Sequence, residues 1–276
     1  MVVNRKSVSA SCLAMCLLAL MNWAPRISAQ ALPPPFNITD VSPTKGNFLD
    51  PAVNHSPSGK MLSLAVSNDG ERLYVGGYSG VWRSDNHGVD WHQLTRPQPL
   101  PGDLVPGALM GHTVFDVVVS PVNRDLVFAA TSRDTHATPQ NGIYQSNDGG
   151  DSWTLAHQFF CAGPAGGGTQ VGQIVFAPDN PDLLFAAGGC AIARRRNGIW
   201  EDKALPGVWH VAVAPRQGVA RRVYAAGNSQ FWYSDNEGDT WSRDTSSGLP
   251  GSFGGVPCDG AQCNSSQVLA VEPGHP

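Results

Sequence analysis

The residues Ser146-Asn147-Asp148-Gly149-Gly150-Asp151-Ser152-Trp153 form a short polar stretch that ends in an aromatic residue. Two other stretches repeat the pattern, Ser84-Asp85-Asn86-His87-Gly88-Val89-Asp90-Trp91 and Ser234-Asp235-Asn236-Glu237-Gly238-Asp239-Thr240-Trp241. All three read Ser-x-Asp/Asn-x-Gly-x-x-Trp, called the turn motif below, and each follows an apolar run with an aromatic residue. In such a loop the Asp or Asn caps backbone N–H groups, the Gly adopts a left-handed conformation and the Trp begins the next strand. The motif therefore predicts a β-hairpin that occurs three times.

The repeated motif resembles the Asp-box (BNR) repeat of sialidases, sortilin-type receptors, xyloglucanase-type glycosidases and photosystem II assembly factors. The resemblance extends over residues 61–271, and its specific part is the three motifs. It implies a β-propeller in which the motifs are structural hairpins, so it indicates a fold and leaves the function open. The residues with this structural role are Ser84, Asn86, Gly88, Trp91, Ser146, Asp148, Gly150, Trp153, Ser234, Asn236, Gly238 and Trp241.

Alternating apolar runs around the motifs recur at the period of a propeller blade, roughly 36 to 58 residues here. First strands are expected at 62–66, 114–119, 171–177, 208–214 and 267–271, and second strands at 73–77, 126–130, 183–187 and 222–226. We expect an all-β protein whose propeller spans residues 61–276. Its four-stranded antiparallel blades are predicted at about 61–96, 114–160, 171–206 and 208–245, and a fifth is expected to begin at Gln267. The third blade has Glu201-Asp202-Lys203 in place of the motif.

The number of blades predicts an incomplete propeller. Propellers close with about four to eight blades, and the proteins that this sequence resembles have more than four. An open arc would leave two blade faces bare.

The N-terminal residues have the pattern of an export signal. Two basic residues precede an apolar run from Cys12 to Met21, and Ala29-Gln30-Ala31 offers a cleavage site. We expect residues 1–31 to be a signal peptide; the alternative is an uncleaved anchor, although the run is short against the ~20 residues of a membrane span. Residues 32–60 are read as a Pro-rich linker or irregular lead-in. The prediction is a secreted or periplasmic protein without a membrane span after cleavage.

Composition argues against nucleic acid as a partner and indicates a chain with many turns. Only 14% of the 276 residues are charged, and the chain contains 31 Gly and 22 Pro, which is typical of short strands joined by turns. The formal net charge is -4 and no basic stripe occurs, so nucleic acid is not an expected partner.

Four cysteines remain after signal removal, an even number that predicts disulfides in an exported chain. We predict the pairs Cys258–Cys263 and Cys161–Cys190, which would hold long loops. No His lies near them at ligand spacing, and neither a metal nor a cofactor is expected.

Candidate ligand-binding residues lie in loops at one end of the predicted blades. By resemblance, ligands bind where the second strand leads into the third and where one blade leads into the next, while the turn motifs lie at the opposite end. The long loop 131–141 of the second blade and the loop 188–197 of the third fall at the ligand end. The candidates are Arg133, Asp134, His136, Arg194, Arg195, Arg196 and, between blades, His112. The guanidinium groups of these arginines, which donate forked hydrogen bonds, would suit an anionic or hydroxyl-rich ligand. The alternative is that the arginines belong to a solvated basic turn without a ligand.

A second set of candidates follows from strand register. Counting back five positions from the turn residues Asn68, Pro121, Pro178, Pro215 and Pro273 gives Ser63, Asp116, Gln173, His210 and Val268. Four of the five are polar within otherwise apolar first strands, and equal register predicts equal height in the propeller. Either they bond neighbouring blades and water, or they form a binding or acid/base set that includes Asp116 and His210.

The sequence favours a binding protein over an enzyme. The Arg-Ile-Pro start of sialidases is missing, whereas Asp134 follows a second strand as a catalytic Asp does in xyloglucanase-type enzymes, without the Gly pair of that family. We predict an exported binding or scaffold module for a carbohydrate or protein partner. The alternative is a glycoside hydrolase-like enzyme acting on extracellular glycans, with Asp134, Asp116 or His210 as candidate catalytic residues. A third hypothesis is a truncated product that does not fold stably.

Overall fold

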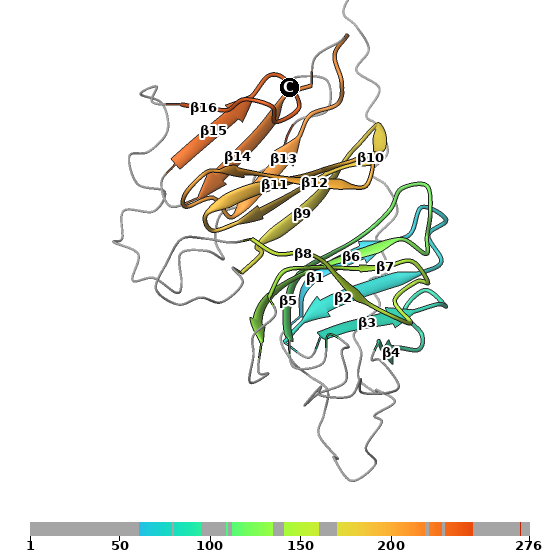
Figure 1. Cartoon of the computed structure of the whole chain (residues 1–276). Coiled ribbons are helices and arrows are strands. Elements are labelled where there is room, and N and C mark those ends of the chain that lie inside the picture. Colours follow the sequence, from blue (N-terminus) through green and yellow to red (C-terminus); the bar gives the residue numbers. More distant parts are fainter. Residues whose placement is uncertain are drawn as a thin grey trace, which may run out of the picture. The chain divides into compact units, whose positions relative to one another are not determined.

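The computed structural model describes residues 61–78, 80–94, 109, 112–134, 141–159, 170–218, 221–227, 230–244 and 271. This part of the chain contains sixteen strands in four sheets of four, and no helix (Figure 1). The prediction of an all-β protein built from four-stranded antiparallel blades is confirmed. The predicted signal peptide, the lead-in and most of the fifth first strand lie outside the described residues.

Each sheet is one blade, and its strands follow one another in chain order as an antiparallel meander. The first blade contains β1 (Met61–Val66), β2 (Leu73–Gly77), β3 (Gly80–Ser84) and β4 (His92–Gln93). The second contains β5 (His112–Val119), β6 (Val127–Asp134), β7 (Ile143–Ser146) and β8 (Thr154–His157). The third contains β9 (Gln173–Ala177), β10 (Asn180–Gly188), β11 (Ala191–Arg196) and β12 (Ile199–Ala204). The fourth contains β13 (His210–Val213), β14 (Val223–Gly227), β15 (Gln230–Ser234) and β16 (Ser242–Arg243).

The turn motif joins the third strand to the fourth in the first, second and fourth blades. The buried Ser hydroxyl accepts the N–H of the motif Gly, as between Ser146 and Gly150 at 2.7 Å. The Asp or Asn accepts the N–H four residues on, for example from Ser152 to Asp148 at 2.9 Å. The residue before the motif Gly has a left-handed φ in every copy, 57°, 72° and 57° at His87, Gly149 and Glu237. These bonds satisfy the loop backbone locally, so one short sequence specifies the hairpin.

The third blade makes the same connection with a two-residue turn and corrects our assignment of its strands. Asn197 and Gly198 have φ values of 51° and 84°, the left-handed pair that suits a tight hairpin. Glu201-Asp202-Lys203, expected in place of the motif, therefore belongs to the fourth strand, β12, and residues 191–196, expected to be a loop, are the third strand, β11.

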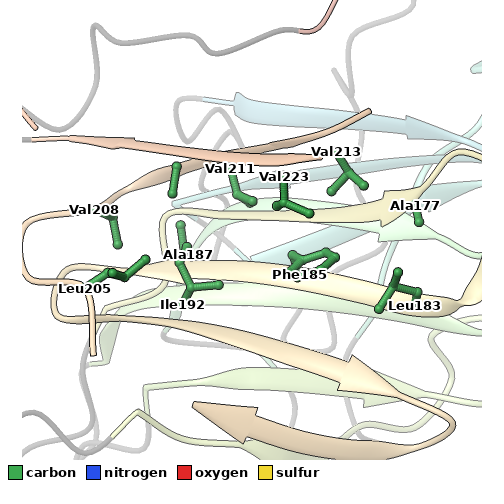
Figure 2. Packing of buried hydrophobic residues seen from close by; sticks show 11 residues of the cluster. Ala177, Leu183, Phe185, Ala187, Ile192, Leu205, Val208, Val211, Val213 and Val223 are labelled. Carbon is green, nitrogen blue, oxygen red and sulfur yellow. The ribbon is translucent and has the colours of Figure 1, made fainter. Parts of the chain in front are cut away.

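The hydrophobic core lies in the joints between consecutive blades. One buried cluster joins the first and second blades, a second joins the second and third, and a third joins the third and fourth. Figure 2 shows the last of these, in which Phe185 of β10 packs with Val211 and Val223 of the fourth blade. The face of a blade that meets the next blade is called its trailing face below, and the face that meets the preceding blade is called its leading face.

Candidate functional site

The polar positions of the first strands connect one blade to the next. In β5, Asp116 Oδ2 accepts the N–H of Ile174 in β9 at 2.9 Å, and in β9, Gln173 Oε1 accepts the N–H of Val211 in β13 at 2.9 Å. The acceptor and donor positions are the same in both joints, because Ile174 and Val211 each follow the polar residue of their own strand. His210 holds this polar position in β13. The three side chains thus share one height along consecutive first strands.

A β-bulge precedes the polar position in the first and second blades. Leu62 and Phe115 are skipped in the pairing of β1 with β2 and of β5 with β6. The third and fourth blades have a related backbone bond. In the fourth, the polar residue His210 pairs with Ala226, and the N–H of Trp209, which precedes His210, donates to the Ala226 carbonyl at 2.9 Å. Bulges twist a strand and redirect its side chains, which explains how a polar residue enters a strand whose neighbours are buried in the core.

Asp116 is the polar residue with the strongest electrostatic perturbation. Burial raises the pKa of its carboxyl from 3.8 to about 7, against the opposing effect of hydrogen bonds from the Ile174 and Val117 N–H groups. A carboxyl with this pKa exchanges a proton near neutral pH, which is a property of acid/base groups as well as of buried structural ones. Both of its oxygens already accept a backbone N–H.

The first blade departs from this pattern. Ser63 holds the polar position, but its side chain is shorter, and its buried hydroxyl has no hydrogen-bond partner in the described part of the chain. The Val117 N–H, equivalent to the donors of Ile174 and Val211, bonds instead to Asp116 of its own strand at 3.0 Å.

The end of the β5–β6 pair brings together three of the predicted residues. His112 is the cross-strand partner of Asp134, and Thr113 is the partner of Arg133. A second bulge at Ser132 lies beside them. Residues 131–134, expected to belong to a loop, instead extend β6, because they continue its ladder with β5. His136 lies outside the described residues.

Arg194, Arg195 and Arg196 do not lie at the predicted ligand end. They belong to β11, whose last residues lead into the Asn197-Gly198 turn that replaces the motif. Arg194 is buried and donates to the Glu237 carbonyl and to Asp239 in the turn motif of the fourth blade. The guanidinium of Arg195 lies 5.3 Å from the centre of the Phe128 ring. These arginines therefore hold blades together at the motif end of the sheets.

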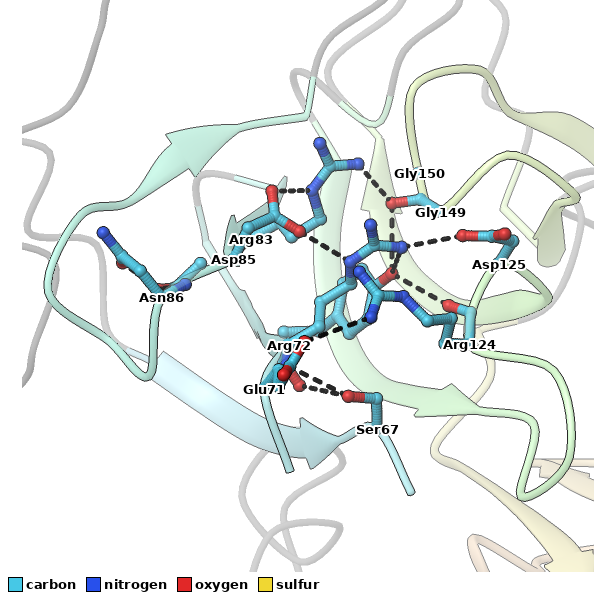
Figure 3. Close-up of polar contacts among 12 residues, drawn as sticks. Ser67, Glu71, Arg72, Arg83, Asp85, Asn86, Arg124, Asp125, Gly149 and Gly150 are labelled. Atoms are coloured by element: carbon cyan, nitrogen blue, oxygen red, sulfur yellow. Dashed lines mark hydrogen bonds and ion pairs between the residues drawn. The ribbon is translucent and has the colours of Figure 1, made fainter. Parts of the chain in front are cut away.

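Arginines at the motif end are the contacts that sequence reasoning missed. Figure 3 shows Arg72 and Arg83 of the first blade reaching the second blade. Arg83 Nη1 donates to the Gly149 carbonyl at 2.7 Å and to Asp151 at 2.8 Å. The equivalent contacts of Arg194 repeat this arrangement in the joint between the third and fourth blades. The signal in the sequence is the Asp that follows the motif Gly in the second and fourth blades and is replaced by Val89 in the first.

The described residues lack two features, a metal-binding cluster and a membrane-spanning helix. They hold no cluster of three or more His, Cys, Asp or Glu side chains suited to a metal ion. They also hold no helix long and apolar enough to cross a membrane. Cys190, in the turn after β10, is disulfide-bonded; Cys161, Cys258 and Cys263 lie outside the described residues, so both pairings stay predictions.

Comparison with known proteins supports the fold. The sequence matches no protein-family model and no curated protein. Among solved structures, an ancestral GH74 enzyme matches with a TM-score of 0.51 and 16% identity, over 67% of this chain and 25% of that chain. The GH74 xyloglucanase from Xanthomonas campestris matches with a TM-score of 0.46 and 19% identity, over 67% and 30%. An extracellular domain of a putative one-component system from B. thetaiotaomicron matches with 0.48 and 10%, over 67% and 22%. This chain therefore spans about a quarter of the length of these structures.

Proposed function

We propose that this protein is an exported Asp-box β-propeller that acts as a binding module for a carbohydrate. The binding site proposed is the end of the blades where the first strands begin. The observation that carries the proposal is the equal height of Asp116, Gln173 and His210 on consecutive first strands, beside the pair formed by His112 and Asp134. The Asp116 carboxylate and Gln173 Oε1 already accept backbone N–H groups, so the groups proposed to meet the hydroxyls of a sugar are the imidazole of His112 and the carboxyl of Asp134.

Two features support this end as the ligand site. First, the bulges before the polar positions and at Ser132 concentrate irregular backbone there, and bulges are over-represented next to active sites. Second, Arg83 and Arg194 at the motif end are committed to carboxylates and carbonyls of neighbouring blades. Fold likeness to an ancestral GH74 enzyme agrees with a glycan ligand only as an analogy.

A glycan-array screen with the purified chain tests the proposal, with Asp134→Asn as the site variant. The matched control is Asp182→Asn, a change of the same kind at an exposed residue at the motif end of β10. We expect the wild type and the control to bind the same glycans and Asp134→Asn to lose at least about tenfold in affinity, because one good hydrogen bond to an ionised group is worth about 1.5–3 kcal/mol. Equal binding by both variants, or binding of a protein partner with no glycan, would contradict it.

The alternative function is a glycoside hydrolase-like enzyme. The raised pKa of Asp116 favours this alternative, since a general acid works best with a pKa near neutrality. Chromogenic glycosides separate the two: turnover by the wild type that Asp116→Asn or Asp134→Asn abolishes would establish the enzyme, whereas glycan binding without turnover supports the binding module.

A further inference from the structure

The sequence contains two Asn-Gly dipeptides, Asn141-Gly142 and Asn197-Gly198, and the fold gives them different surroundings. In such a pair the backbone nitrogen of the second residue can attack the side chain of the first, because glycine has no Cβ to obstruct the approach. The reaction is deamidation, and it needs only water. How firmly a folded protein holds the two residues decides whether it occurs, so the structure distinguishes one pair from the other.

The first pair is buried and held by hydrogen bonds. Asn141 is only 8% exposed. The Gly142 N–H, which would have to attack, donates instead to Thr131 Oγ1 at 2.8 Å, and the Gly142 carbonyl accepts from the same hydroxyl at 3.0 Å. A Cβ on Gly142 would collide with the His157 carbonyl of β8, so the neighbouring strand leaves this peptide no room to turn. Deamidation of Asn141 therefore requires this part of the second blade to open first.

The second pair is exposed and forms the two-residue turn between β11 and β12. Its only bound group in the described part of the chain is the Asn197 N–H, which donates to the Asp182 carbonyl at 3.1 Å. The Asn197 carboxamide and the Gly198 N–H have no hydrogen-bond partner there. Around a Cβ placed on Gly198, the nearest atom would be Arg195 Nη2 at 3.8 Å. The peptide between Asn197 and Gly198 can therefore turn without a collision.

The geometry of this turn also favours the reaction. Asn197 and Gly198 have φ values of 51° and 84°, which is one of the two favoured two-residue hairpin turns. Rotation of the peptide plane between them gives the other favoured turn, in which the first residue stays left-handed and the second does not. This rotation brings the Gly198 nitrogen to the side-chain side of Asn197. Both strands keep their register, because Arg196 still pairs with Ile199.

We propose that Asn197 is a site of spontaneous deamidation in the folded protein and that the fold protects Asn141. The Gly198 nitrogen bonds to Cγ of Asn197, and the side-chain nitrogen leaves as ammonia with the proton that the Gly198 nitrogen has lost. A five-membered succinimide ring remains. Water then opens this ring at either of its two carbonyl groups, which gives aspartate or isoaspartate at position 197.

Isoaspartate at this turn affects a hairpin that contacts both neighbouring blades. On the leading face of the third blade, Trp200 of β12 stacks on His157 and contacts Phe128 of the second blade. On the trailing face, Arg194 of β11 bonds to Glu201 of β12 and to the fourth blade. Isoaspartate adds one backbone atom and one negative charge to a two-residue turn. Because turn length sets hairpin register, we expect it to shift β12 against β11 and to weaken these contacts.

Peptide mapping of the full chain by mass spectrometry, after incubation at neutral pH under native conditions, tests the proposal. We expect the mass gain of deamidation at Asn197. At Asn141 we expect a rate that is lower by at least about tenfold, since reaction there has to wait for a local opening. The two dipeptides are chemically identical, so Asn141 is the control for Asn197. In chain unfolded by urea the protection of Asn141 is removed, and the two rates should become similar.

Two results would overturn the proposal. One is an Asn197 that stays unmodified in the folded chain while it reacts in urea, because the turn would then hold its peptide fixed. The other is an equal or faster rate at Asn141 in the folded chain. The variant Asn197→Asp adds the charge without the extra backbone atom. We expect the isoaspartate form, separated by chromatography, to unfold at a lower temperature than this variant, and equal midpoints would contradict the shift of β12.

Discussion

At the scale of single residues, Asp116 shows how a polar group is accommodated inside a joint. Its carboxylate suits two backbone donors, but burial favours its protonated form and raises its pKa to about 7. The unfolded carboxyl has a pKa of about 3.9. Because the folded pKa is higher, the folded state binds the proton more tightly, and this stabilisation is complete below about pH 4 and is lost as the pH rises through 7.

The corresponding prediction concerns Asp116→Asn, which does not titrate. Near pH 5 we expect the variant to be less stable than the wild type by about 1–3 kcal/mol, because one N–H loses its acceptor. By pH 8 the wild type bears the cost of a buried charge, so the difference should shrink or reverse. Urea unfolding at both pH values measures it, and a difference that does not change with pH would rule out the titration of Asp116.

The motif serine is the second residue whose role can be isolated. Ser146 is 1% exposed, accepts the Gly150 N–H and donates to Asp148 at 2.7 Å. We expect Ser146→Ala to lower the free energy of unfolding by about 1–3 kcal/mol, since a buried N–H loses its partner. Ser242→Ala, on the exposed outer strand β16, is the control and should stay within about 0.5 kcal/mol. Equal losses for both would contradict the capping role.

At the scale of strands and loops, the sequence was most informative where a side chain determines the backbone. The turn motif predicted three hairpins because its Ser, Asp or Asn and Gly satisfy their own loop. The third blade was misread because Asn197-Gly198 is a shorter hairpin signal and the residues before it are three arginines. A strand of charged residues is unusual, and it is stable here because Arg194 finds its partners in the next blade.

The hydrogen bonds from Arg194 to the turn motif of the fourth blade give a prediction at this scale. Its guanidinium is nearly buried, and it donates to the Glu237 carbonyl at 2.8 Å and to the Asp239 carboxylate. We expect Arg194→Gln to cost about 1.5–3 kcal/mol. A double-mutant cycle with Asp239→Asn, followed by chemical denaturation, should give a coupling of at least about 0.5 kcal/mol. Additive effects would mean that the two side chains contribute independently.

At the scale of the whole molecule, regular spacing predicted the four-stranded blades, because each unit repeats the same strands and turns. The candidate site was less predictable. Counting from the turns placed Asp116 and Gln173 at one height, but only the structure shows that each accepts an N–H from the next blade. Those bonds join residues 58 and 38 positions apart in the chain, and one sequence carries no direct signal for such contacts.

The same joints determine how the molecule should unfold. A single sheet cannot bury both faces, so each blade depends on its neighbours for most of its apolar burial. Ile174 is 2% exposed in the joint between the second and third blades, and Ile174→Ala should cost about 2–5 kcal/mol. If the blades unfold together, calorimetry of this variant should show one transition, lowered by about 5–15 °C. Ile199→Ala, at a residue 67% exposed on β12, should leave the transition nearly unchanged. A second transition in the Ile174 variant would instead mean that the two sides of this joint unfold separately.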